Sequence, residues 1–136
     1  MKVFVSSSRT NREMARDTIN RFIERGWEIT FNWTDDAVRQ TEYTTAQMQA
    51  LATNLMHAID TCERYVLLLP GGINSHVELG IALALRKPVW IFNAGEYSMN
   101  EDDPLACAFY FAPGVKLFDG LFPNSERLNT TNGQEG

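Results

Sequence analysis

The middle of the sequence constrains the fold more strongly than any other part. Residues Tyr65–Leu69 form a continuous apolar run, which is typical of a strand in the middle of a parallel sheet, where both faces are buried. Pro70–Gly72 ends that strand, an Ala- and Leu-rich stretch predicts a helix over Ser75–Leu85, and Pro88–Phe92 is predicted to be the next strand. A strand, a helix and a second strand in succession indicate a right-handed parallel unit, so an α/β fold is expected.

The remaining segments extend this alternation. Apolar periodicity and end signals predict strands Val3–Val5, Trp27–Trp33 and Val115–Phe118, a helix from Thr10, its N-cap, to Gly26, and a helix over Thr45–Thr61. The order predicts a single domain over residues 1–123, a three-layer α/β sandwich of the flavodoxin or Rossmann-like kind around a parallel sheet of four or five strands. The polar residues 124–136 are expected to form a flexible C-terminal tail.

Composition narrows the classes of partner. The chain has 136 residues, of which 44% are hydrophobic and 21% charged, as in ordinary globular domains. Its net charge of −5 disfavours binding to a nucleic-acid polymer, which needs a basic face, but leaves room for a local pocket that holds one phosphate. The short apolar start is too brief for a signal peptide and no stretch has the length of a membrane span, so a cytoplasmic protein without a membrane partner is expected.

No metal site is predicted. Cys62 and Cys107 lie far apart in apolar surroundings, and His57 and His76 do not have the spacing of metal ligands. Two free thiols in a reducing compartment are the expectation.

A ligand site is expected at one edge of the sheet. In open parallel sheets ligands bind beyond the carboxyl ends of the strands, near the point where the strand order reverses. The loop after the first strand brings Ser7, Ser8 and Arg9 to that edge, and their hydroxyl, backbone and guanidinium donors suit a phosphate. A polar loop with a solvated arginine is the alternative.

The loop after the central strand is the second candidate. Gly71 and Gly72 allow a sharp turn and a close approach of the backbone to a ligand. The helix predicted to start at Ser75 directs its free N–H groups into the same crevice, where an anion or a sugar hydroxyl is stabilised.

Glu78 is the principal candidate catalytic residue. In the first turn of the predicted helix the dipole favours its ionised form, which suits a nucleophile at a sugar carbon. The alternative is a capping box, in which Ser75 caps the helix and Glu78 merely accepts from the backbone N–H of that cap.

Three further side chains have two interpretations each. Trp33 is interpreted either as stacking on a base or as packing at the end of its strand. Asp35 and Asp36 are interpreted either as proton donors to a leaving group or as turn-forming residues. His76 is expected to make local hydrogen bonds and not to act as a base.

Residues Leu67–Val89 resemble the core motif of the nucleoside 2-deoxyribosyltransferase family, which has a strand, a glycine-containing loop, Glu-Leu-Gly, an Ala/Leu-rich helix and Lys-Pro. Glu78–Gly80 and Lys87–Pro88 carry this resemblance. The serine–arginine turn after the first strand is similar to the phosphate-holding turn of the family's deoxynucleoside 5′-monophosphate N-glycosidases. Phe109–Val115 is similar to a late family segment, and the resemblance covers about residues 2–118.

The resemblance implies an activity. Glu78 would attack C1′ of a deoxyribose or stabilise an oxocarbenium-like centre there, the base would leave, and water or a second base would resolve the intermediate. It also implies a nucleoside or nucleotide substrate, no cofactor, and a homodimer or larger homo-oligomer. The Pro-Gly-Gly loop also resembles that of cytokinin-activating phosphoribohydrolases, which act on the same kind of bond.

One position departs from the family pattern. The family places an aspartate on the second helix where this chain has Leu55, beside Asn54. Three possibilities therefore stay open: a hydrolase with another acid such as Asp35 or Asp36, a weak enzyme, or a nucleotide-binding module without turnover. An NAD-cleaving domain related to Toll/interleukin receptor domains is a further alternative.

Overall fold

The computed structural model describes residues 1–35, 42–97 and 107–128. The strands form a six-stranded sheet in the order β2-β1-β3-β4-β5-β6, parallel except for the last pair. The elements are β1 (Lys2–Ser6), η1 (Arg9–Asn11), α1 (Arg12–Glu24), β2 (Glu28–Ile29), η2 (Trp33–Asp35), α2 (Thr45–Thr61), β3 (Arg64–Leu68), α3 (Ile73–Ala84), β4 (Val89–Phe92), η4 (Ala108–Phe111), β5 (Val115–Asp119) and β6 (Glu126–Arg127). The predicted α/β class is confirmed.

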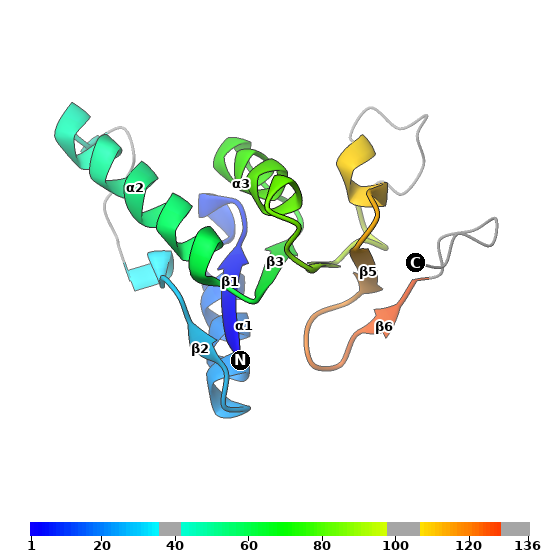
Figure 1. Ribbon diagram of the computed structural model, residues 1–136. Helices are drawn as coiled ribbons and strands as arrows, with labels where there is room; N and C mark the ends of the chain where they lie inside the picture. The colour runs from blue at the N-terminus through cyan, green and yellow to red at the C-terminus, as the bar shows by residue number, and fades with distance from the viewer. Residues whose placement is uncertain (36–41, 98–106, 129–136) are drawn as a thin grey trace.

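Helices cover both faces of the sheet, with α2 and α3 on one side and α1 on the other (Figure 1). The Tyr65 hydroxyl donates to the carbonyl of Ser75 in α3 at 2.8 Å, so this side chain faces α3. Tyr65 pairs with Val89, and the next residue, Trp90, therefore faces the opposite side, where its ring lies 5.9 Å from that of Trp27 after α1. The arrangement is the predicted three-layer sandwich.

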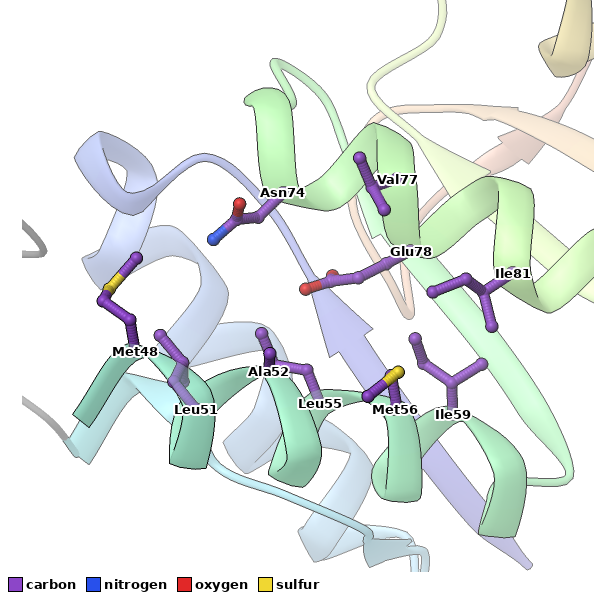
Figure 2. A pocket seen from close by; sticks show the side chains of 10 residues that line it. All are labelled: Met48, Leu51, Ala52, Leu55, Met56, Ile59, Asn74, Val77, Glu78 and Ile81. Carbon is purple, nitrogen blue, oxygen red and sulfur yellow. The ribbon is translucent and has the colours of Figure 1, made fainter. Parts of the chain in front are cut away.

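The strand order reverses between β1 and β3. From β1 the chain moves outward to β2, and from β3 it moves the other way through β4 to β5. The carboxyl ends of β1 and β3 therefore open a crevice, which is where ligands bind in sheets of this kind. Helices α2 and α3 lie side by side over this region (Figure 2).

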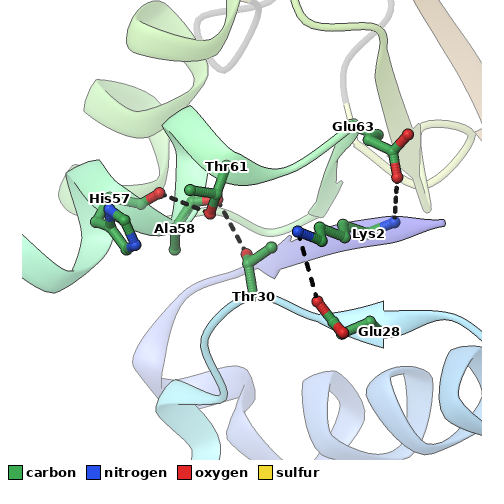
Figure 3. A network of polar contacts seen from close by, with 7 residues as sticks. All are labelled: Lys2, Glu28, Thr30, His57, Ala58, Thr61 and Glu63. Carbon is green, nitrogen blue, oxygen red and sulfur yellow. Dashed lines mark hydrogen bonds and ion pairs between the residues drawn. The ribbon is translucent and has the colours of Figure 1, made fainter.

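A network of polar contacts at the opposite end of the strands holds β1, β2 and α2 in register (Figure 3). The backbone N–H of Lys2 donates to Glu63 Oε1 at 2.8 Å, and the Thr30 hydroxyl donates to the carbonyl of Ala58 at 3.0 Å. The exposed pair between Lys2 and Glu28, at 4.0 Å, adds little by itself. The bond between Thr30 and Ala58 ties the C-terminal part of α2 to the chain that follows β2.

Several predicted boundaries were wrong. The strand expected over Trp27–Trp33 is only Glu28–Ile29, because Trp33 turns inward in η2 and its indole N–H donates to the carbonyl of Val5 at 2.7 Å. The first helix does not begin with Thr10 as its cap, since η1 intervenes and its cap is Ser8. Glu126–Arg127 within the expected tail pairs antiparallel with β5, which makes the sheet six-stranded.

Within the described residues, no helix combines the length and the apolar character needed to cross a bilayer.

Candidate active site

Glu78 lies at the crevice, on the face of α3 directed toward β1. The helix begins at Ile73 with Gly72 as its N-cap, so Glu78 lies in the second turn and not in the first. The hydroxyl of Ser75 accepts from the Gly72 N–H at 2.6 Å, which satisfies the cap. The alternative in which Ser75 caps the helix and Glu78 serves that cap is therefore wrong.

The Glu78 carboxylate is buried, with 6% of the residue exposed, and the Ser6 hydroxyl donates to its Oε1 at 2.6 Å. Burial raises the pKa of Glu78 to about 7, and the hydrogen bond from Ser6 opposes that rise. The expectation that the helix dipole favours the ionised form assumed that Glu78 lies in the first turn; in the second turn the dipole acts weakly and desolvation dominates. Near neutral pH the carboxylate and the carboxylic acid are both populated.

The buried phenol of Tyr65 interacts electrostatically with the Glu78 carboxylate. Burial, followed by the negative charge of Glu78, raises the pKa of Tyr65 well above its ordinary value. The phenol therefore stays protonated, and it donates to the carbonyl of Ser75. It anchors the first turn of α3 to the sheet from below.

Two hollows meet at Glu78. The larger is an apolar cleft of about 220 Å³ between α2 and α3, and Figure 2 shows its lining residues: Met48, Leu51, Ala52, Leu55, Met56, Ile59, Asn74, Val77, Glu78 and Ile81. The smaller, of about 30 Å³, is a polar hollow lined by Ser6, Ser7, Arg9, Trp33, Leu51, Leu55, Asn74 and Glu78. Glu78 thus lies where a hollow that contains several polar groups adjoins an apolar cleft.

The apolar wall opposite Glu78 comes from α2. Leu51 and Leu55 line both hollows. At the position where the family resemblance implies an aspartate, the wall therefore offers Glu78 no hydrogen-bond partner. The same apolar side chains contribute to the desolvation that raises the pKa of Glu78.

Ser6 and Asn74 lie within the two loops expected to bind a ligand, but the sequence assigned neither of them a role. Ser6 is the last residue of β1, two positions after buried Phe4, so the two side chains face the same side of the sheet. This spacing was the one signal in the sequence that Ser6 points inward. Asn74 lines both hollows, and in Figure 2 its amide and the Glu78 carboxylate project from α3 into the space above α2.

The serine turn after β1 is tied to the loop after β3. The Ser7 hydroxyl donates to the carbonyl of Leu68 at 2.9 Å and accepts from the Asn11 amide at 2.9 Å. The backbone N–H of Ser8 donates to the carbonyl of Pro70 at 3.2 Å. These bonds bring the two predicted ligand loops together.

Arg9 and Trp33 line the polar hollow beside these loops. The Arg9 guanidinium carbon lies 5.9 Å from the centroid of the Tyr43 ring. The indole of Trp33 is held by its bond to Val5, so its orientation is fixed by the sheet.

Gly71 and Gly72 differ in whether their surroundings leave room for a side chain. A Cβ at Gly71 would lie 2.7 Å from Ser75 Oγ and 2.8 Å from His76 Cε1, so a side chain there would displace the turn that caps α3. A Cβ at Gly72 would make ordinary contacts with Ser8. His76 makes the expected local bond through Nδ1 to the carbonyl of Gly72, and a second, long-range bond through Nε2 to the Tyr110 hydroxyl at 2.7 Å.

Asp35 does not join Glu78. Asp35 is exposed and forms an ion pair with Arg16 at 2.6 Å, and it does not line either hollow. Asp36 lies outside the described residues. In the described part of the chain, no group of three or more His, Cys, Asp or Glu side chains is arranged to hold a metal ion.

The fold and the site define a class: a parallel α/β domain with a buried carboxylate at the switch point of its sheet. No protein-family model matches the sequence, and no curated protein matches it. The fold is similar to that of a CMP N-glycosidase from Clostridium botulinum, BcmB, with a TM-score of 0.58 over 88% of each chain. The two sequences are 18% identical, so the likeness shows the fold.

Proposed function

We propose that this protein cleaves the N-glycosidic bond of a nucleoside or nucleoside 5′-monophosphate, with Glu78 as the nucleophile. The observation that carries the proposal is the placement of this buried carboxylate, bonded to Ser6, where the polar hollow meets the apolar cleft. The activity named for the structural neighbour, a CMP N-glycosidase, supports the same class of bond.

The reaction proceeds in two displacements. Ionised Glu78 attacks C1′ from the face opposite the base, the C1′–N bond breaks with its electron pair going to the base, and the base takes up a proton. The resulting ester between the sugar and Glu78 is attacked at C1′ by water, which loses a proton and leaves Glu78 as the carboxylate. The chemistry needs no cofactor, because the carboxylate supplies the nucleophile.

The substrate's polar end is assigned to the loops around the polar hollow. Arg9 supplies a guanidinium for a phosphate, and the exposed hydroxyl of Ser8 lies in the turn beside it. The Ser7 hydroxyl is bonded to the carbonyl of Leu68, so its role is to hold this turn in place. Gly71, Gly72 and Ser75 place the start of α3 at the same point, where the helix dipole favours an anion. Trp33 borders the base.

The leaving base needs a proton donor beside Glu78. Asp35 is engaged by Arg16 and would have to leave that exposed pair to reach the site. Asp36 remains a candidate for this role.

The test is direct measurement of free base. We expect release from at least one member of a panel of ribo- and deoxynucleosides and their 5′-monophosphates, followed by chromatography with and without an acceptor base. Preference for a monophosphate will support the phosphate role of Arg9, and an acceptor-dependent product will identify a transferase. Absence of release from every member would contradict the proposal.

A second candidate function is a nucleotide-binding module without turnover. The apolar side chain of Leu55 at the edge of both hollows favours it, because the family resemblance implies an acid there. Under this alternative, a nucleotide binds without release of base and binds equally well to a Glu78 variant.

Ser6→Ala tests whether the ionised form of Glu78 is the reactive one. Removing the donor to Glu78 Oε1 is expected to raise the pKa of Glu78 further, by about one unit, since a hydrogen bond to a charged group contributes roughly 1.5–3 kcal/mol. The acidic limb of the kcat/KM profile should therefore move about one unit toward higher pH. Ser125→Ala is the matched control, and an unmoved limb in Ser6→Ala would contradict the role of the carboxylate.

A homodimer is also part of the proposal. Four apolar side chains around the cleft are strongly exposed, at 39% for Met48, 51% for Met56, 87% for Ile73 and 59% for Val77. An apolar surface of this kind, rimmed by polar residues, is typical of a protein contact. A second copy that covers it would enclose the site at Glu78.

A further inference from the structure

A third hollow lies at the opposite end of the sheet from Glu78. It has a volume of about 510 Å³, and its lining includes Arg64, Arg86, Lys87, Lys116 and Trp90. Arg64 is the first residue of β3 and Lys116 is the second residue of β5, so this basic groove lies at the amino ends of the strands. The groove and the candidate active site therefore do not share residues.

The groove concentrates positive charge in an acidic protein. The whole chain carries 12 Lys and Arg and a net charge of −5, yet four of those cations line this one surface. The residues that line it include no Asp or Glu. Within the described ranges, none of the four cations takes part in an ion pair.

The four cations come from different elements of the fold, so the preference of helix ends for basic residues does not explain all of them. Arg86 and Lys87 follow α3, where basic residues complement the helix dipole, and Lys87 Nζ donates to the carbonyl of Asp60 at 2.7 Å. Arg64 and Lys116 lie on strands and have no such role. Arg86 also occupies a left-handed position, with φ of 59°, that Gly or Asn usually fills after a helix.

The Arg64 guanidinium stacks on the Trp90 ring, and its N–H groups make no hydrogen bond within the described structure. Its central carbon lies 4.1 Å from the centroid of the Trp90 ring, a close stacking contact. Arg64 Nε and Trp90 Nε1 are both buried, and neither has a hydrogen-bond partner in the described structure. Because both atoms are closed off from solvent, a ligand in the groove would reach Arg64 through its outer guanidinium nitrogens, which are not among the buried unpartnered atoms.

We propose that the basic groove binds the polyphosphate group of a small anion, of the nucleoside diphosphate class, at a site separate from Glu78. Guanidinium and ammonium groups bind phosphate oxygens through charge-assisted hydrogen bonds, and the groove volume is in the range of small-molecule pockets. The site does not depend on the proposed glycosidase activity.

Inorganic pyrophosphate is the probe, measured by calorimetry against Arg86→Asn/Lys116→Gln. Both side chains are exposed, and Asn tolerates the left-handed backbone at position 86, so the double variant is expected to fold. Its affinity should fall at least about tenfold, as expected for loss of charge-assisted bonds. The control Arg25→Gln/Arg127→Gln has the same net charge, changes exposed residues that do not line the groove, and should bind within about twofold of wild type.

A second experiment distinguishes pyrophosphate binding in this groove from binding at the candidate active site, which also has groups suited to phosphate. Arg9→Ala should keep the pyrophosphate binding that the groove variant loses. The chain has three tryptophans, so the indole N–H signal of Trp90 can be followed by NMR, and it should shift on titration with pyrophosphate. Absence of pyrophosphate binding to wild type, equal loss in the two double variants, or loss only in Arg9→Ala would overturn the proposal.

Discussion

Glu78→Gln is expected to lower the rate of base release by at least about a thousandfold while leaving the fold intact. The amide has nearly the same shape as the carboxyl group, and its oxygen can still accept the hydrogen bond from Ser6. It cannot form the ester with C1′, so the first displacement is lost. The measurement is initial rate of base release on the best substrate of the panel, with circular dichroism as the check on folding.

The matched control for this result is Glu24→Gln, which makes the same chemical change on the exposed surface of α1. It should retain wild-type rate. A Glu78→Gln variant that still releases base at more than about a tenth of the wild-type rate would exclude Glu78 as the nucleophile. Equal ligand binding in both variants, with no release by wild type, would favour the binding module.

Glu78→Gln is also expected to stabilise the protein at alkaline pH. Burial raises the pKa of Glu78 from 4.5 to about 7, so the folded state holds its proton more tightly than the unfolded state. Between these two values the folded state binds more protons, and stability therefore falls as pH rises through that window. Above it, the ionised buried carboxylate costs on the order of 3 kcal/mol, which the neutral amide avoids.

Urea denaturation of wild type and Glu78→Gln at pH 4 and pH 8 measures this effect. The two proteins should have similar free energies of unfolding at pH 4, and the variant should be more stable by about 3 kcal/mol at pH 8. Other titrating groups are common to both proteins and cancel in the difference. Parallel stability curves across this range would show that the pKa of Glu78 is not raised by folding. Such a gain in stability on loss of a charged group is typical of functional sites, where strain is retained for activity.

The candidate site was only partly predictable from local patterns. The Pro-Gly-Gly turn, the following helix and the nearby Glu78 all lie within one short segment, so the sequence placed the carboxylate near the crevice. Its neighbour Ser6 is 72 residues away in the chain, and no local pattern links the two. The ionisation of Glu78 was mispredicted for the same reason, because burial is set by side chains from α2 and β1.

The sequence by itself determined the class of fold. The continuous apolar segment Tyr65–Leu69, the glycine turn and the amphipathic helix after it restrict the chain to a buried parallel strand followed by a crossover. Helix α2 follows from local periodicity in the same way, and its predicted limits, Thr45–Thr61, are those observed. These features depend on residues close together in the chain.

Tertiary structure alone decided which polar groups meet. It turned Trp33 inward to Val5 and ended β2 early, and it placed Leu55 at the edge of both hollows beside Glu78. It also gathered Arg64 and Lys116, from strands separated by β4, into one basic groove. The physical reason is that hydrogen bonds, desolvation and charge clustering depend on distances in space, which local sequence patterns do not encode.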